Sequence, residues 1–311
     1  MNKITWLIKR ELWEHRDGFV FAPAIVALLL VAVMAAWVFA GVVLHGNMHL
    51  SLNGVEINIS NTQLAATQLD ALRASFGVGF SFISILLLGL NGFVVFFYCL
   101  GSLFDERKDR SILFWKSLPV SDAMTVVSKV LTATVVAPLI TIAITTSTVI
   151  ILLILAAIAL GWAGQSVALL LTPSIALMPV KLVSILPVQI LWALITVGWL
   201  MMISSMVKSK PFLYAVGTPV LGLTLLGVIN ASFKLGLPMG ELTNAALRLL
   251  SGTIPRSWNF IVAANDANES FGAYISQEWA TSSVNGLWQG AAVGVVMVYI
   301  AIRIRQRAVD V

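Results

Sequence analysis

The stretch Asp105–Asp122, DERKDRSILFWKSLPVSD, decides the fold class, because it is a dense run of charge in an otherwise apolar sequence. It carries four acidic and four basic side chains, whereas charged residues make up only 11% of the whole chain. Two long apolar runs, Phe76–Phe104 and Val126–Ala159, flank it. Each ionised group costs roughly 2.5 to 3.5 kcal/mol at the centre of a membrane-spanning helix. The pattern therefore predicts that this stretch lies in water between two membrane crossings.

The middle of this stretch is amphipathic. Ile112–Trp115 is apolar, two polar residues follow, and Pro119 ends the pattern. Ser121 then offers a hydroxyl that suits the N-cap of the next helix. We predict a short helix held at the membrane surface. It is either a loop whose aromatic side chains rest on lipid head groups or a docking element for another protein.

Composition indicates a membrane protein. Hydrophobic residues make up 59% of the 311 residues, and the mean hydropathy is +0.95. Soluble domains have an apolar share of about 45–50%. Apolar runs of 18 or more residues recur, and each is long enough to cross a bilayer as a helix. A single cysteine, Cys99, excludes a disulfide framework within the chain and a cysteine-based metal cluster.

The predicted fold is all-α: one polytopic membrane domain, residues 1–311, with an interfacial helix at 1–18 that Trp6 and Trp13 anchor. Residues 105–122 form a coupling segment between spans two and three, and residues 231–283 form the largest segment between spans. That last segment either dips into the membrane with short helices or covers the surface as a lid. The six predicted spans are Phe19–Leu44, Phe76–Phe104, Val126–Ala159, Leu182–Val207, Phe212–Ile229 and Val284–Ile302.

Two smaller features interrupt this helical pattern. The sequence VEINIS, which begins at Val55, follows an Asn-Gly turn signal and predicts a short strand. Pro138 predicts a kink in the long third span.

Basic residues predict the orientation. Six spans place both termini on one side, together with residues 105–129 and the turn at Lys208. That side receives fourteen of the 19 lysines and arginines. Cytoplasmic loops of membrane proteins carry the excess of Lys and Arg. We therefore expect both termini and the Asp105–Asp122 stretch to be cytoplasmic and residues 231–283 to lie outside.

The sequence predicts no catalytic residue and no metal ligand. It contains no Gly-Lys pair, and thus no Walker A loop, and neither H-E-x-x-H nor G-x-S-x-G. His45 and His49 stand four apart, as on one face of a helical turn, but no carboxylate lies near them in the sequence. The middle of each predicted span lacks Asp, Glu, Lys and Arg, which disfavours a proton- or sodium-coupled carrier.

Uncharged polar residues recur along single faces of the spans. They either hydrogen-bond within the helix bundle or line a substrate path, and the residues proposed for a path are Asn91, Thr141, Thr145 and Gln189. The last span begins with a glycine row at four-residue spacing, which predicts close helix packing: Gly286, Gly290 and Gly294.

Taken together, these features resemble the permease subunits of ABC-2 type transporters. An interfacial helix, six spans, a charged segment after span two and a long segment before span six match that architecture. The local similarity comprises Glu106, Leu113, Leu118-Pro119-Val120-Ser121 and Lys129. The glycine that often precedes the lysine in the family is Ser128 here.

The resemblance implies the permease subunit of an ATP-driven exporter, which is not itself an enzyme. ATP and Mg²⁺ would bind to separate cytoplasmic ATPase subunits, and the chain itself would bind no cofactor. Further partners would be a second identical or homologous permease and membrane lipid, but not nucleic acid, and the location would be the bacterial cytoplasmic membrane. The alternative is a membrane scaffold or assembly factor that transports nothing and docks a cytoplasmic partner.

The same resemblance assigns ATPase contact to the segment after span two. Phe114 and Leu118 are the expected anchors, and Trp115 either joins them or rests on head groups. Glu106 either pairs with Arg110 along the helix or reaches the partner. The full predicted contact set is Asp105, Glu106, Arg110, Leu113, Phe114, Trp115, Leu118 and Pro119.

Overall fold

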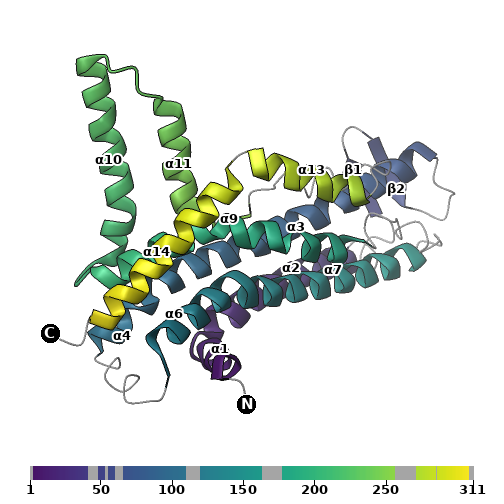
Figure 1. Cartoon of the computed structure of the whole chain (residues 1–311). Helices are drawn as coiled ribbons and strands as arrows, with labels where there is room; N and C mark the ends of the chain where they lie inside the picture. Colours follow the sequence, from purple (N-terminus) through teal and green to yellow (C-terminus); the bar gives the residue numbers. More distant parts are fainter. Residues whose placement is uncertain are drawn as a thin grey trace.

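The computed structural model describes residues 3–40, 48–52, 55–59, 66–109, 120–162, 177–255, 271–284 and 286–307. Within them the protein is a helical bundle with one small hairpin (Figure 1). Six helical segments are long and apolar enough to cross a membrane, which confirms the predicted class of all-α polytopic membrane protein. They are Asp17–Phe39, Arg73–Lys108, Asp122–Gly161, Met178–Met206, Pro211–Phe233 and Leu287–Arg307.

The elements follow the predicted order. The first half of the chain contains α1 (Lys3–Glu14), η1 (Asp17–Phe21), α2 (Ala22–Phe39), β1 (Met48–Leu52), β2 (Val55–Ile59), α3 (Ala66–Ser102) and α4 (Phe104–Lys108). The second half contains α6 (Asp122–Leu131), η3 (Thr132–Val136), α7 (Ala137–Trp162), α9 (Met178–Met206), α10 (Pro211–Phe233), α11 (Met239–Ser251), α13 (Phe271–Val284) and α14 (Leu287–Arg307).

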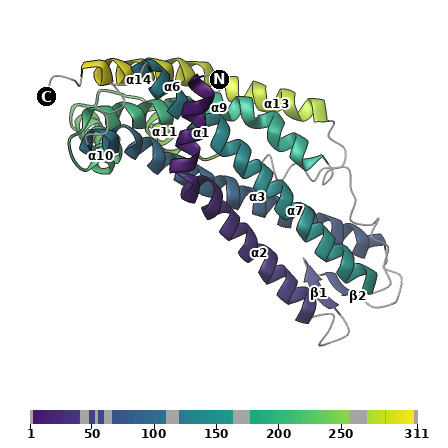
Figure 2. The same ribbon diagram turned by 90° about the horizontal axis from the view of Figure 1, so that it is seen from below.

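The hairpin lies at the end of α2 and α3 that is remote from the chain termini (Figure 2). Its strands are antiparallel, with Met48 opposite Ile59 and Leu52 opposite Val55. This confirms the strand predicted at VEINIS. The helical turn considered for His45 and His49 is wrong for His49, which lies in β1, and His45 is outside the described residues.

Two prolines are each preceded by a short π-helix. One is Pro23, near the start of the first span, and the other is Pro138, in the third span. The N–H of Ala22 bonds to the carbonyl of Asp17, and the N–H of Ala137 bonds to that of Thr132, each five residues back. Pro23 and Pro138 follow directly and have no N–H to donate. A wide turn is one way in which a helix adapts to such a position. The third span therefore continues through Pro138 as one 40-residue helical segment, with its irregularity just before the predicted kink.

Helices α9 and α14 pack side by side along their length (Figure 1). A Cβ on Gly294 would lie 2.7 Å from the backbone nitrogen of Ile195, and a Cβ on Gly198 would lie 3.0 Å from the Cα of Gly294. Both distances are too short for a side chain. Glycines at these two positions therefore let the two backbones approach, as in other small-residue helix contacts in membranes.

Helices α10 and α11 form an arm that leaves the bundle. They are seen end-on in Figure 2, where α2, α3 and α7 are seen along their length. Ala215 is the only residue of α10 that is buried, so the helix is surrounded by protein only near its base. Helix α10 has the length and hydropathy predicted for a fifth span. Its axis, however, is not aligned with those of α2, α3 and α7.

The end of α11 returns to the side of α9. Thr196 donates its hydroxyl hydrogen to the carbonyl of Arg248 (2.9 Å) and accepts from the N–H of Gly252 (3.0 Å). Gln189 donates to the carbonyl of Gly252 (3.2 Å). These contacts lie near the middle of α9, so they favour insertion of this part of residues 231–283 between the spans over a surface lid.

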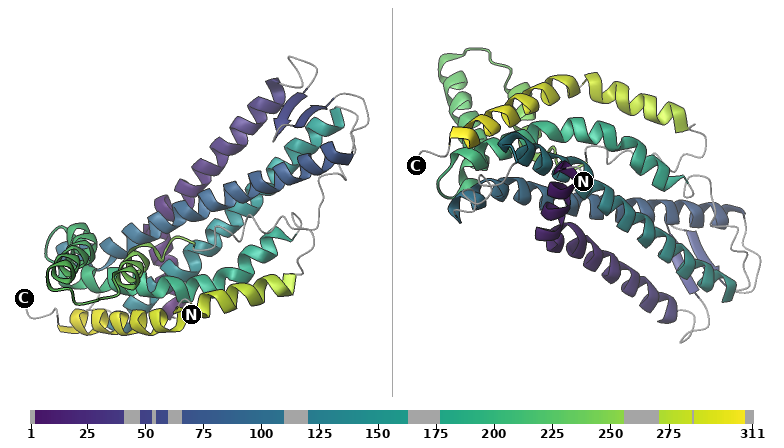
Figure 3. Two further views of the ribbon diagram at one scale, coloured as in Figure 1. Left: turned by 90° about the horizontal axis from the view of Figure 1, so that it is seen from above. Right: turned by 60° about the horizontal axis from the view of Figure 1, so that its bottom comes forward.

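Both ends of the described chain lie at the same end of the bundle. Helix α6 packs against both α1 and α14 there, and Figure 3 shows it between them. The larger buried apolar cluster occupies this end and includes Phe19, Leu103, Val126 and Ala301. This end therefore brings together the N-terminal helix, the end of the last span and both flanks of the Asp105–Asp122 stretch.

Candidate functional site

Helix α6 positions the first basic group of the site. The side-chain oxygen of Ser121 accepts a hydrogen bond from the backbone N–H of Met124 (3.2 Å), which confirms the predicted N-cap. Two turns later Lys129 is buried, with 3% of its side chain exposed. Burial of an ammonium group requires compensating acceptors.

The N-terminal helix supplies the first of these acceptors. Glu11 is fully buried, and Lys129 donates to both of its oxygens, at 3.0 and 2.9 Å. The hydroxyl of Tyr98 donates to the same carboxylate (2.9 Å), and Arg10 also pairs with it. Burial raises the pKa of the Glu11 carboxyl, but the attraction of Lys129 and Arg10 and the hydrogen bonds outweigh it and leave this pKa below its ordinary value.

A second acid joins the cluster from α4. Glu106 lies 3.1 Å from the ammonium of Lys129, pairs with Arg305 of α14, and lies 3.9 Å from Arg10. Arg305 also donates to Asp122 at the start of α6 (3.0 Å). We refer to these six residues as the ion-pair cluster: Arg10, Glu11, Glu106, Asp122, Lys129 and Arg305.

For Glu106 and Asp122, this cluster corrects the expectation that the charges of the Asp105–Asp122 stretch lie in water, whereas Asp105, Lys108 and Asp109 are exposed as expected. Only 10% of the Glu106 side chain and 20% of the Asp122 side chain are exposed, and Arg305 on the opposite helix is 3% exposed. The three acids balance three bases inside the protein. A buried pair that is fully compensated can replace hydration, whereas one that loses a partner leaves a costly charge.

The cluster ties α1 and α14 to α4 and α6, which carry the two ends of the predicted coupling segment. Glu106 precedes residues 110–119 and Asp122 follows them, and both bind Arg305 of α14. Lys129 adds α1 to the same contact. A displacement of either flank would therefore act directly on the N-terminal helix and on the last span.

The predicted partner-contact residues are only partly within the described structure. Glu106 belongs to the ion-pair cluster, and Asp105 is exposed and lines an open pocket. The proposed pairing of Glu106 with Arg110 and the proposed anchors lie outside the described residues: Arg110, Leu113, Phe114, Trp115, Leu118 and Pro119.

The sequence alone did not indicate the acid at the centre of the cluster. Glu11 stands four residues after Leu7, and both are buried on the same face of α1. A carboxylate in line with the apolar face of an amphipathic helix is the signal that was available. Its partner, Lys129, was named only as part of the family similarity.

The polar residues proposed for a substrate path mostly bond to neighbouring helices or to their own. Thr141 donates its single hydroxyl hydrogen to the side-chain oxygen of Asn91 (3.1 Å) or to the carbonyl of Ala137 (3.1 Å). Thr145 bonds to the carbonyl of Thr141 (2.8 Å). These contacts favour the packing interpretation for both threonines.

Asn91 and Gln189 meet at a small internal cavity of about 30 Å³, which Thr134 also lines. This volume has room for one or two water molecules and not for a larger solute. In the described residues, neither Thr141 nor Thr145 is part of its lining.

The other glycines of the last span surround an arginine. Arg248 of α11 donates to the carbonyl of Gly286 (2.7 Å), and its guanidinium lies 3.9 Å from the ring centroid of Trp192. A Cβ on Gly290 would lie 2.6 Å from the Cζ atom of this arginine. Gly286, with φ of 78°, adopts a conformation that favours glycine. The missing side chain at Gly294 therefore leaves room for the backbone of α9, and those at Gly286 and Gly290 leave room for the side chain of Arg248.

One group of possible metal ligands lies beside the cluster. Ligand atoms of Glu11, Glu14 and His15 lie within 4.8 Å of one another. The carboxylate of Glu11 already accepts from Lys129 and Tyr98, so it has little capacity left for a metal ion. We therefore assign no metal to this group.

No protein-family model matches the chain, and no curated protein sequence matches it.

Proposed function

We propose that this chain is the membrane permease subunit of an ATP-driven exporter of the ABC-2 type, which works with separate cytoplasmic ATPase subunits. The six span candidates and the shared end of both termini agree with such a subunit. In this proposal the end that carries the ion-pair cluster faces the cytoplasm of a bacterial cell, and a second permease copy or a homologous permease completes the transporter.

The observation that carries the proposal is the position of the ion-pair cluster. A transport subunit driven by a partner requires a rigid connection between the docking segment and the spans. Glu106 and Asp122 flank that segment and are joined through Arg305 to α14 and through Lys129 to α1. Movement of the segment on ATP binding would thus be transmitted to the first and last elements of the bundle together.

Docking and transmission can be tested separately. Aromatic and apolar anchors dominate the affinity of interfaces, and truncating one typically costs about 2 kcal/mol or more. We expect the double variant Phe114→Ala, Leu118→Ala to insert into the membrane and to lose co-purification with the proposed ATPase subunit. We expect Glu106→Gln to keep the ATPase bound and to lose transport-linked hydrolysis.

Purification with the ATPase, vesicle transport and hydrolysis assays would measure these effects. Lys208→Ala is the matched control, because this residue is exposed in a turn predicted on the same face and lies outside both residues 105–122 and the ion-pair cluster. Normal ATPase recovery and normal transport in the double variant would overturn the docking role. ATPase recovery without any transported solute or lipid would instead support a scaffold.

A further inference from the structure

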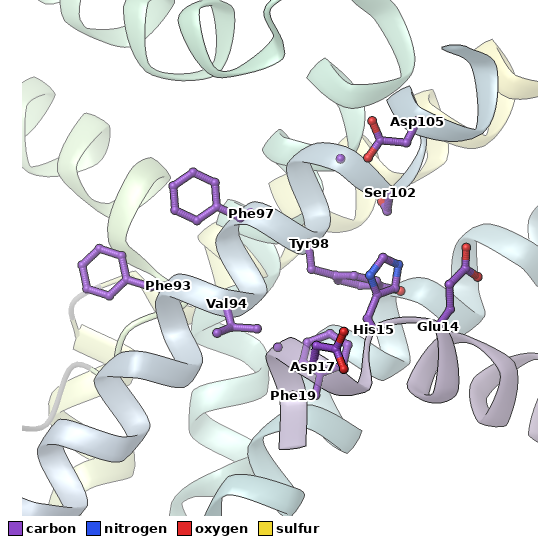
Figure 4. Close-up of a pocket in the computed structure, with 12 residues that line it drawn as sticks. Glu14, His15, Asp17, Phe19, Phe93, Val94, Phe97, Tyr98, Ser102 and Asp105 are labelled. Carbon is purple, nitrogen blue, oxygen red and sulfur yellow. The ribbon is translucent and has the colours of Figure 1, made fainter. Parts of the chain in front are cut away.

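An open pocket of about 530 Å³ lies between the first span and α3 (Figure 4). One wall is the segment from Glu14 to Phe19, and the floor is a face of α3. The two approach closely at Gly18, where a Cβ would lie 3.0 Å from a methyl carbon of Val94. None of the six residues of the ion-pair cluster lines the pocket, although Tyr98, which does, donates to Glu11.

The pocket extends from an apolar end to a polar end. Phe93 and Phe97 stand one turn apart on α3 and are more than half exposed, at 58% and 57%. Figure 4 shows them together on one side of α3, with His15 and Glu14 on the other side. Both phenylalanines lie inside a span candidate, whereas Glu14 lies before the first span and Asp105 near the end of the second. The pocket therefore runs across the expected boundary between hydrocarbon and water.

The polar end has a negative balance. The twelve described residues that line the pocket include three carboxylates, Glu14, Asp17 and Asp105, and neither lysine nor arginine. Arg10 lies 3.8 Å from Glu14, and Arg16 lies 3.9 Å from Asp17. In each of these pairs at least one of the two side chains is largely exposed. Such pairs contribute little and leave their acids available.

The wall between the two ends adds no positive charge. The ring of His15 packs edge-on against Tyr98 at 4.9 Å, and Phe19 packs against Tyr98 at 5.0 Å. Burial lowers the pKa of His15 below its ordinary value, so at neutral pH this residue adds no positive charge.

We propose that this pocket binds a membrane-dissolved amphiphile with a cationic amine head and an aliphatic tail. The head lies among Asp17, Asp105 and Glu14 on the water side, and the tail lies along Phe93 and Phe97. An anionic head would meet three carboxylates, so charge complementarity selects the amine. This assignment is independent of the proposed transport function, because it rests on the pocket alone.

A photoactivatable hexadecylamine with a diazirine in its tail tests the proposal. The probe is added to the purified full chain in phosphatidylcholine vesicles, irradiated, and mapped by mass spectrometry. The matched probes are the corresponding alcohol and carboxylic acid. We expect the amine to label residues 93–98 and to exceed the labelling by either matched probe.

Charge variants locate the head. Asp105→Asn should lower amine labelling about fivefold at low salt, as expected for the loss of one facing charge. The triple variant Glu14→Gln, Asp17→Asn, Asp105→Asn should abolish the preference of the site for the amine over the alcohol. Glu241→Gln, which removes an exposed carboxylate of α11, should leave it unchanged.

The tail is located by Phe93→Ala, which truncates an exposed side chain. It should lower labelling by the amine and the alcohol alike. Equal labelling by the amine and the carboxylic acid would overturn the proposal. Labelling outside the pocket would also overturn it. The same holds if the preference for the amine over the alcohol survives in both the folded Asp105→Asn variant and the folded triple variant.

Discussion

Lys129 and Glu11 are 118 positions apart in the chain, yet the ammonium of one lies 3.0 and 2.9 Å from the two carboxylate oxygens of the other. Both side chains are shielded from solvent. This contact fixes the N-terminal helix against α6 and places the ion-pair cluster at the end of the bundle.

Removal of one partner of this pair should be strongly destabilising. Lys129→Met leaves the carboxylate of Glu11 buried with Arg10 as its remaining basic partner, and such changes cost about 3 to 5 kcal/mol. Thermal unfolding of the purified protein in detergent measures the loss. The double variant Glu11→Leu, Lys129→Met should recover most of it, because two acids and two bases of the cluster remain. A single variant as stable as the native protein would contradict the role of the pair.

Acid should weaken the same contact. The pKa of Glu11 lies below its ordinary value of 4.5, so its ionised form is favoured in the folded state. Its contribution to the free energy of unfolding is complete above about pH 4.5, the unfolded value, and is lost as the pH falls through the lower folded value. The stability difference between the native protein and Glu11→Gln should therefore be largest at pH 6 to 7 and shrink toward pH 3. A difference that grows on acidification would contradict this sign.

The close approach of α9 and α14 should not tolerate a side chain. Gly294→Leu would place its Cβ 2.7 Å from the backbone of Ile195, so the helices must separate and folded yield should fall. Gly222→Leu in α10 is the control, because no neighbouring atom lies within 4 Å of its Cβ position. The yield of folded protein in detergent and its unfolding temperature would measure the difference. Equal losses in both variants would contradict the packing role.

The hydrogen bond between Thr141 and Asn91 should contribute modestly to the free energy of unfolding. Thr141→Val removes the donor at 3.1 Å, and hydrogen bonds between membrane helices average about 0.6 kcal/mol. Thr145→Val removes only a bond within its own helix and should cost less. Unfolding in mixed micelles measures both. If Thr141→Val kept full stability and altered transport, the substrate-path interpretation would be favoured.

Cysteine labelling tests the orientation. The native Cys99 is fully buried, so background reaction with an impermeant maleimide should be low. Cysteines at Ser60 and Asn268 should react from outside intact cells. Those at Lys108 and Arg307 should react only after lysis, and Arg307 is chosen because Arg305 is buried in the cluster. Outside reaction at Lys108 would reverse the assignment of the cytoplasmic face.

The sequence by itself predicted the features that depend on local pattern. Runs of apolar residues gave all six span candidates, with most ends within about five residues of those observed. Hydrocarbon length and the need to satisfy backbone groups act on each segment alone, so composition is enough to place it. The N-cap at Ser121 and the strand at Val55 depend on neighbouring residues and were predicted for the same reason.

Only the tertiary structure decided which charges meet. Glu11 and Arg305 stand near opposite ends of the chain, and no local pattern links either of them to Glu106 or Lys129. The sequence therefore indicated exposed charge where the structure has compensated burial. The direction of the α10–α11 arm was also not predictable, because contacts with α9 at the two places where the arm joins the bundle set it. Interactions between distant segments depend on how the spans pack, and hydropathy carries no information on that packing.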